Sequence, residues 1–387
     1  MARPLSAALC LLAWLALSCA AHAGRPCGNR GPGAAARCES LSFDGRERTY
    51  RLYVPARRAS AAPVLLVLHP ALFTGATMEA ITAGGFDRRA DATGALIVYP
   101  DGVEQHWNDG RESTPAARAH VDDVGFLRAL VAALAARYPI DPARIYVSGF
   151  SNGGMMTLRL ACQAADLFAG FVAVAASLGE ELARQCHPQP PRPVAIIDGT
   201  ADPLVPYGGG TVGLFGSRGR VVGAEATFAL FSAAAGCSAR DVQPGVPEAG
   251  SGAPEIRVHR AGGCPAGISV ALFEVRGGGH AWPGGARVSP QVILLRGSLS
   301  HAIDATDETW RFLGLDAAAP VAPPQDETEV RDLAKHGARG GSGASTMRCL
   351  SSASAACGSS TKQNRSRSSG AMVPWRTRAS KLITSFQ

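Results

Sequence analysis

Short, continuous runs of apolar residues recur along the middle of the chain, separated by segments with helical spacing. The runs fall at residues 64–68, 95–99, 145–148, 171–175, 194–197 and 268–275. Uninterrupted apolar runs are typical of strands that helices cover on both faces. Apolar residues recur every three or four positions over 121–138, and residues 152–163 and 305–313 are also predicted to be helices. This alternation predicts an α/β fold, a three-layer sandwich with a mostly parallel central sheet.

The N-terminal part of the chain does not follow this alternation. Residues 1–23 combine a basic start at Arg3, an apolar run and a small-residue cleavage site, which together predict a secretory signal peptide. The apolar run is too short to predict a membrane span. Residues 40–43 and 49–54 then predict an opening hairpin around a turn at Asp44 and Gly45. We therefore expect the folded domain to occupy residues 24–318.

The net charge of +7 lies outside this predicted domain. Residues 24–318 contain 27 basic and 27 acidic side chains, a balance that argues against a nucleic-acid-binding surface. Residues 319–387 contain ten Lys or Arg and four Asp or Glu, with no apolar period. We expect them to form a disordered, basic, low-complexity tail. The alternative is a basic anchor for an anionic cell surface.

Cysteine usage suggests an oxidising compartment. Six cysteines fall in the predicted domain: Cys27, Cys38, Cys162, Cys186, Cys237 and Cys264. An even set in an exported chain favours disulfides, so we expect a secreted or periplasmic protein. Pairing in sequence order closes three short loops, but six cysteines allow fifteen connectivities, and buried free thiols are the alternative. The Cys and His spacings do not match zinc sites, so we expect no metal.

One stretch of the sequence indicates nucleophilic catalysis. Residues 145–156 predict a strand, a serine between glycines and then a helix, with Gly149, Ser151 and Gly153 at the G-x-S-x-G spacing. A sharp strand-to-helix turn at the serine requires small neighbours because larger side chains would clash there. The helix that follows would direct its free N–H groups toward negative charge developing at the serine. Ser151 is therefore the candidate nucleophile.

A serine nucleophile needs a base, and the base needs an acid that orients it. His280 follows the predicted strand 268–275 in a glycine-rich loop and is the candidate base. Asp198 and Asp202 both follow the strand 194–197, and either could be the acid, although Asp202 lies further out where a loop carboxylate can reach a histidine. The order Ser151, Asp202, His280 is the order that α/β-hydrolases use.

Several blocks of this sequence resemble a known family. Residues 149–156, 199–203 and 278–284, with further matches at 99–102, 107–111 and 121–126, look like the secreted polyhydroxybutyrate depolymerases and feruloyl esterases, the carbohydrate-esterase-family-1-like group of α/β-hydrolases. The resemblance covers about residues 40–315. It implies the α/β-hydrolase fold with Ser151 as nucleophile, Asp202 as acid and His280 as base. The chain departs from the family at Asp198, where histidine is usual, so either aspartate remains open as the partner of His280.

A second departure concerns the oxyanion hole. The family usually has His-Gly after the first core strand, whereas this chain has His69-Pro70. Proline has no N–H, so the expected donors are the backbone N–H of Asn152 with that of Ala71 or Leu72. No metal or organic cofactor is expected. Phe150, Trp107 and Trp282 could line an acyl pocket or belong to the core.

The resemblance implies a carboxylic ester hydrolase that works through an acyl-enzyme, on polyhydroxyalkanoate, feruloyl or acetylxylan esters. No polymer-binding module or threonine-rich linker follows the domain in this sequence, so we expect small esters or soluble oligomers as substrates. We also expect a monomer that binds no nucleic acid. The alternatives are a serine peptidase on the same fold and a catalytically silent surface-binding protein.

Overall fold

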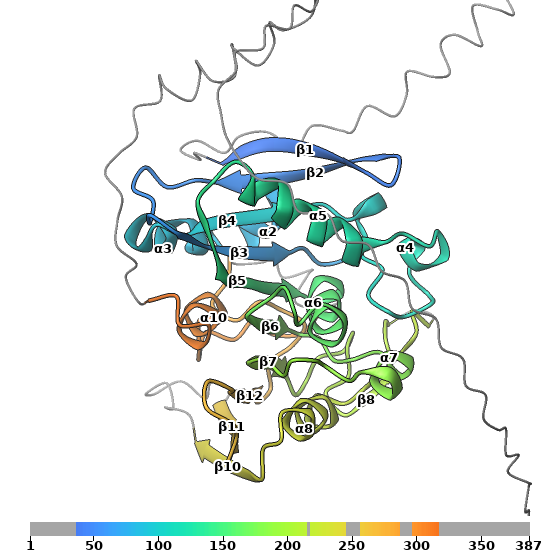
Figure 1. Ribbon diagram of the computed structural model, residues 1–387. Coiled ribbons are helices and arrows are strands. Elements are labelled where there is room, and N and C mark those ends of the chain that lie inside the picture. The colour runs from blue at the N-terminus through green and yellow to red at the C-terminus, as the bar shows by residue number, and fades with distance from the viewer. Residues whose placement is uncertain (1–35, 215–216, 245–255, 287–295, 317–387) are drawn as a thin grey trace, which may run out of the picture. The chain divides into compact units, whose positions relative to one another are not determined.

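The computed structural model describes residues 36–214, 217–244, 256–286 and 296–316 (Figure 1). The predicted signal peptide, the predicted tail and Cys27 lie outside the described residues, so the domain boundaries stay predictions. Within the described ranges, no helix is both long enough and apolar enough to cross a bilayer.

The described strands form one large sheet and one small hairpin. The strands of the large sheet are β1 (Arg37–Phe43), β2 (Arg46–Tyr53), β3 (Ala62–Leu68), β4 (Leu96–Pro100), β5 (Ile140–Phe150), β6 (Gly170–Val174), β7 (Val194–Gly199), β10 (Ala239–Pro244), β11 (Ile256–Gly262) and β12 (Val270–Val275). Their order is β1-β2-β4-β3-β5-β6-β7-β12-β11-β10. The pairs from β4 to β12 are parallel, and antiparallel strands extend the sheet at both edges. The small hairpin consists of β8 (Gly209–Thr211) and β9 (Arg220–Val222).

Helices cover both faces of the sheet, as Figure 1 shows. The helices are α2 (Gly75–Ile81), α3 (Gly85–Thr93), α4 (Pro115–Arg118), α5 (Asp123–Ala135), α6 (Asn152–Gln163), α7 (Glu180–Gln185), α8 (Ala224–Ala234) and α10 (Ala305–Phe312), with a 3-10 turn, η1 (Val103–Gln105). Leu66 of β3 packs in the core with α5, α6 and α8, whereas Leu65 packs in the core with α3 and α10. Successive strand residues point to opposite faces, so an all-apolar strand needs both helical layers. The predicted three-layer α/β fold is confirmed.

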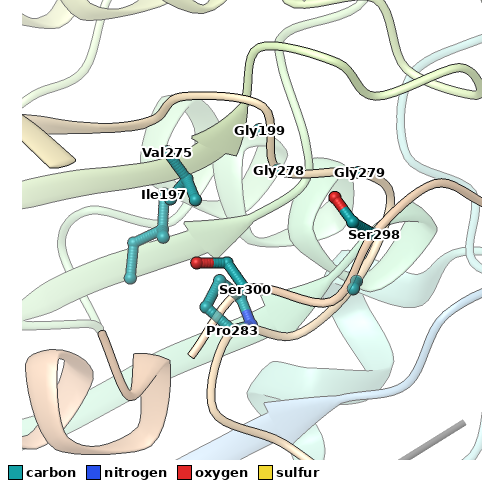
Figure 2. Close-up of a pocket in the computed structure, with 9 residues that line it drawn as sticks. Ile197, Gly199, Val275, Gly278, Gly279, Pro283, Ser298 and Ser300 are labelled. Carbon is teal, nitrogen blue, oxygen red and sulfur yellow. The ribbon is translucent and has the colours of Figure 1, made fainter. Parts of the chain in front are cut away.

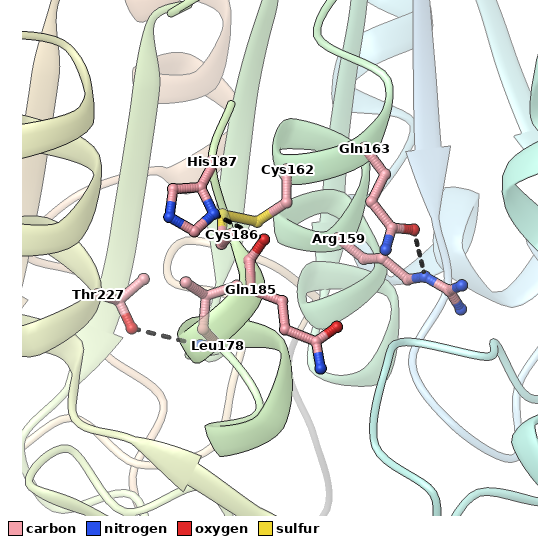
Figure 3. Close-up of a disulfide and its surroundings, with 8 residues drawn as sticks. All are labelled: Arg159, Cys162, Gln163, Leu178, Gln185, Cys186, His187 and Thr227. Carbon is pink, nitrogen blue, oxygen red and sulfur yellow. Dashed lines mark hydrogen bonds between the residues drawn. A yellow bond between two sulfur atoms is a disulfide. The ribbon is translucent and has the colours of Figure 1, made fainter. Parts of the chain in front are cut away.

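Two described disulfides connect loops to helices. Cys162 at the end of α6 bonds to Cys186 after α7, and Figure 3 shows this bond. Cys237 after α8 bonds to Cys264 after β11. These are two of the pairs expected from sequence order. The third expected pair includes Cys27 and is not described.

Candidate active site

Ser151 lies in a strained turn between β5 and α6. Its backbone has φ 56° and ψ −118°, a conformation that non-glycine residues rarely adopt. Its N–H donates to the Val174 carbonyl of β6 at 2.9 Å. A Cβ at Gly149 would lie 2.4 Å from the Gly153 carbonyl oxygen, and one at Gly153 would lie 2.3 Å from the Leu68 carbonyl oxygen. Both glycines are therefore required for steric reasons, and the turn has the geometry of a nucleophile elbow.

The structure brings Ser151, His280 and Asp202 together from three separate loops. His280, after β12, has its Nε2 at 2.9 Å from the Ser151 Oγ and its Nδ1 at 2.7 Å from the Asp202 Oδ2. The other carboxylate oxygen of Asp202 accepts the N–H groups of Leu204 and Val205 at 2.7 and 2.9 Å. The Asp202 acceptor favours the His280 tautomer in which Nδ1 carries the proton. Nε2 is then unprotonated and can accept the serine proton.

The His280 loop is held by backbone contacts and a stacked ring. The His280 N–H donates to the Arg296 carbonyl, and the Phe150 ring stacks on the imidazole with centroids 5.2 Å apart. Figure 2 shows a cavity next to this loop, where Ile197 of β7 and Val275 of β12 meet Pro283. Its volume of about 10 Å³ accommodates roughly one water molecule. The cavity is thus too small to hold a substrate.

Asp198 and Asp202 occupy different environments. The Asp198 carboxyl group has its hydrogen-bond partners in the segment after β6: its Oδ1 accepts the Ala176 N–H at 2.8 Å, and its Oδ2 accepts the Ser177 hydroxyl at 3.3 Å. Burial raises the pKa of Asp198 to about 8, and the neighbouring Asp202 carboxylate also raises it. The aspartate that contacts the histidine is therefore Asp202, and Asp198 is largely protonated at neutral pH.

The oxyanion candidates differ in whether their N–H groups are available. The Asn152 N–H is at the first position of α6, where no intrahelical acceptor exists. The Leu72 N–H donates to the Gln105 carbonyl at 2.9 Å and is already engaged. The Ala71 N–H has no acceptor within the described part of the chain. Ala71 is thus the better second candidate, a choice that depends on Gln105, which the sequence did not single out.

A buried polar network fixes the side chain of Asn152. Its amide exchanges hydrogen bonds with the backbone of Trp107 at 2.8 and 3.1 Å, and its Nδ2 donates to the Asp109 carboxylate at 2.7 Å. Asp109 is fully buried and pairs with Arg111 through several N–H groups. Sequence reasoning missed the role of Asp109. Its signal was the polar block 107–111 before the elbow, but only the fold shows that this block meets α6.

The three aromatic candidates for substrate binding are buried. Trp107, Phe150 and Trp282 have exposed fractions of 0, 2 and 2%. The Trp107 indole N–H donates to the His69 carbonyl, and Trp282 packs edge-on against Phe150. These contacts favour the core interpretation over an open acyl pocket, because none of the rings has surface to offer a ligand.

His69 is also buried, and its ring is neutral at physiological pH. Its Nδ1 donates to the Pro70 carbonyl, and its Nε2 accepts the Gly102 N–H at 2.9 Å. Burial lowers the pKa of His69 to about 4. His69 therefore joins two loops beside the candidate site and has no free nitrogen for catalysis.

Among the described residues, Glu225, His259 and Glu274 bring three possible metal-ligand atoms within 4.8 Å of one another. Arg240 donates to both Glu225 and His259, and His259 contacts Glu274 at 2.9 Å. A guanidinium cation thus already contacts two of the three groups of this cluster, which joins α8 to the antiparallel edge strands.

Comparisons with known proteins place this geometry in a family. Residues 115–179 match the prolyl oligopeptidase family. The chain is 35% identical over 281 residues to NocK of Nocardia uniformis subsp. tsuyamanensis, which is named as an esterase; the match covers 70% of this chain and 80% of NocK. Feruloyl esterase B of Piromyces equi is 31% identical over 57% of this chain and 40% of its own length. A poly(3-hydroxybutyrate) depolymerase of Ralstonia pickettii is 33% identical over 36% of this chain and 32% of its own length.

Among solved structures, the acetyl xylan esterase of Aspergillus awamori matches with a TM-score of 0.50 at 14% identity, over 72% of this chain and 99% of that one. At this identity the match shows the fold alone. The match to NocK spans most of both chains and carries the family relationship. This chain therefore belongs to the α/β-hydrolase carboxylic ester hydrolases, in the group that contains feruloyl esterases and polyhydroxybutyrate depolymerases.

Proposed function

We propose that the protein is an exported serine esterase that works through a triad of Ser151, His280 and Asp202. The observation that carries this proposal is the pair of hydrogen bonds on His280, 2.9 Å to the Ser151 Oγ and 2.7 Å to the Asp202 Oδ2. Both His280 and Asp202 are nearly buried, with exposed fractions of 4 and 7%. Water is thus largely excluded from the ion pair that would form during catalysis, which strengthens it.

The reaction would proceed in two acyl transfers. His280 Nε2 takes the Ser151 hydroxyl proton while the serine oxygen attacks the ester carbonyl carbon. The protonated imidazole then gives this proton to the leaving alcohol oxygen as the ester C–O bond breaks. A water molecule, deprotonated by the same nitrogen, attacks the acyl-enzyme and releases the carboxylic acid. Asp202 stabilises the imidazolium in both steps without itself taking the proton.

Two backbone N–H groups would stabilise the oxyanion of each tetrahedral intermediate. The proposed donors are Asn152, at the positive end of α6, and Ala71, whose N–H has no acceptor among the described residues. The Asn152 side chain is tied to Trp107 and Asp109, so the first donor is fixed before substrate arrives. Each such donor contributes roughly 10²–10³ to the rate in comparable enzymes.

The proposed substrates are small esters or soluble oligomeric esters. Leu72, next to the proposed donor Ala71, is 60% exposed and offers apolar surface to an acyl or alcohol group. The names of the relatives point to feruloyl and hydroxybutyrate esters for those proteins. Export is supported by the two disulfides and by the predicted signal peptide.

A second candidate activity is peptide hydrolysis, because residues 115–179 match the prolyl oligopeptidase family. The same triad chemistry cleaves amides as well as esters. The match covers a minor part of the chain, whereas the match to NocK covers 70% of it. We therefore propose ester hydrolysis, and the substrate panel below also includes peptide substrates.

The test is a substrate panel assayed with three proteins. Methyl ferulate, hydroxybutyrate oligomers, acetylated xylan, short p-nitrophenyl esters and peptide p-nitroanilides are compared for the wild type, Ser151→Ala and Ser148→Ala. Ser148 is a matched control, because it is fully buried in β5 with a hydroxyl that has no partner in the described structure. We expect ester hydrolysis in the wild type and S148A and a loss of about 10⁴-fold or more in S151A. Ester hydrolysis retained in S151A, or a preference for the anilides, would contradict the proposal.

A further inference from the structure

One buried carboxyl group has no part in the proposed acyl-transfer steps. Asp198, at the end of β7, is 4% exposed. Its oxygens contact the segment that follows β6, through the Ala176 N–H at 2.8 Å and the Ser177 hydroxyl at 3.3 Å. Burying a carboxyl group costs free energy of folding unless hydrogen-bond partners satisfy its oxygens.

The segment that Asp198 contacts lies directly behind the nucleophile. The Val174 carbonyl accepts the Ser151 N–H at 2.9 Å, and the next residue, Ala175, has a positive φ of 48°. Ala176 packs so closely on α6 that a Cβ at Gly154 would lie 2.7 Å from the Ala176 Cβ. A displacement of this segment would therefore change the position of Ser151.

Two further contacts anchor the segment on either side of Asp198. The Ala175 N–H donates to the Ile197 carbonyl at 2.9 Å. Figure 3 shows the Leu178 N–H donating to the Thr227 hydroxyl, at 3.3 Å. Between these two anchors, Asp198 holds Ala176 and Ser177 through its side chain.

The surroundings of Asp198 favour its neutral form. The titratable groups next to Asp198 are Asp202 from the same loop, Tyr207 from the next loop and Glu274, its register neighbour on β12. Beyond them lie Glu225 of α8 and Arg240, which act on Tyr207, and His259, which pairs with Glu274. Burial raises the pKa of Asp198 to about 8, and the negative charge of Asp202 acts in the same direction, whereas the hydrogen bonds from Ala176 and Ser177 lower this pKa. The Asp198 Oδ1 accepts the Ala176 N–H and its Oδ2 accepts the Ser177 hydroxyl. A protonated carboxyl group keeps acceptor capacity for both contacts without a buried charge.

We propose that Asp198 is a positioning residue for the nucleophile: its carboxyl group fixes Ala176 and Ser177 through hydrogen bonds and so maintains the position of Ser151. This role rests on the proposed function of Ser151. Loss of the proton puts a second negative charge beside Asp202 in a buried site, and that cost is relieved when the carboxylate moves toward water. The segment behind the elbow then loosens, and the rate of acyl transfer falls.

The test compares Asp198→Asn with Asp198→Ala and with a matched control. Asparagine keeps the shape and remains neutral, with an oxygen that accepts the Ala176 N–H and an NH₂ group that donates to the Ser177 hydroxyl once this hydroxyl has rotated to accept. Alanine removes both contacts. The control is Asp87→Asn, because Asp87 is also buried, its pKa is raised to about 7 by burial, and it contacts Tyr99 rather than the elbow. The kcat and KM for a short p-nitrophenyl ester are measured from pH 6 to pH 10.

We expect the wild-type kcat to fall about tenfold between pH 7 and pH 9, because a group titrating near pH 8 goes from about nine-tenths to about one-tenth protonated. D198N should match the wild type within about twofold at pH 7 and lack this fall, and D198A should be impaired at every pH. KM should be unchanged in both variants. D87N should keep the wild-type profile.

Thermal unfolding gives a readout that does not depend on catalysis. The pKa of Asp198 is raised in the folded state, so its proton stabilises the fold below the pKa of the unfolded chain, and this stabilisation is lost as the pH rises toward 8. The Tm of the wild type should therefore fall relative to that of D198N between pH 5 and pH 8. The proposal is overturned if the difference in Tm between the wild type and D198N does not change with pH, or if kcat of D198N also falls between pH 7 and pH 9. It is equally overturned if D198N is unfolded or is as inactive as D198A. Activity retained in S151A would instead overturn the proposed function.

Discussion

At the scale of single residues, the sequence identifies the nucleophile and the base more reliably than it identifies the aspartate that contacts the base. Ser151 and His280 were predicted from a glycine-flanked serine and a glycine-rich loop after a strand. The choice between Asp198 and Asp202 could not be made in the same way, because Asp198 lies at the end of β7 and Asp202 follows within a few residues. It depends on which backbone N–H groups each carboxylate meets: those of Leu204 and Val205 for Asp202, and that of Ala176 for Asp198.

The orientation of His280 gives a residue-scale prediction. Asp202→Asn should keep the acceptor for the Leu204 and Val205 N–H groups but direct an NH₂ group at His280 Nδ1. The imidazole would then carry its proton on Nε2 and could not accept the serine proton. We expect kcat to fall by about 10³–10⁴ with little change in KM. A loss below tenfold in p-nitrophenyl ester kinetics would show that Asp202 does not orient the base.

At the scale of elements, the hydrophobic pattern predicted the buried strands and the helices 121–138, 152–163 and 305–313. It missed the helices α2, α3, α4, α7 and α8, the small hairpin of β8 and β9, and the edge strands β10 and β11. The edge strands contain charged as well as apolar residues, and Arg240 and Asp241 of β10 are examples. Charged residues are tolerated there because other elements cover only part of the surface of an edge strand. Such strands are stabilised by pairing, β10 with β11 and β11 with β12, and a local sequence pattern does not report these contacts.

The elbow gives an element-scale prediction about its glycines. Gly153→Ala would bring a Cβ to 2.3 Å from the Leu68 carbonyl oxygen, so α6 would have to move away from β3. We expect the free energy of unfolding to fall by about 1–3 kcal/mol, as overpacking does elsewhere, and ester hydrolysis to be largely lost. Gly208→Ala is the control, because, apart from its chain neighbours, no atom of the described residues lies within 4 Å of its added Cβ. Equal Tm values and activities for the two variants would contradict this account of the elbow.

At the scale of the whole molecule, the alternation of strands and helices was sufficient to predict the three-layer fold. The loops were not predictable from it, and they determine the site. Gln105 engages the Leu72 N–H and Asp109 fixes Asn152, although both come from a loop more than forty residues before α6. The substrate depends on the same loops, so its chemical identity follows from neither the fold nor the triad.

The central claim is that one serine in this molecule is activated by its neighbours, and active-site labelling tests it most directly. The wild type and S151A are incubated with a fluorophosphonate, and the adduct is measured by intact mass and located by peptide mapping. We expect one adduct per chain in the wild type, on Ser151, and none in S151A, because unactivated serines do not react at a comparable rate. An adduct on another residue, or labelling that persists in S151A, would contradict the account.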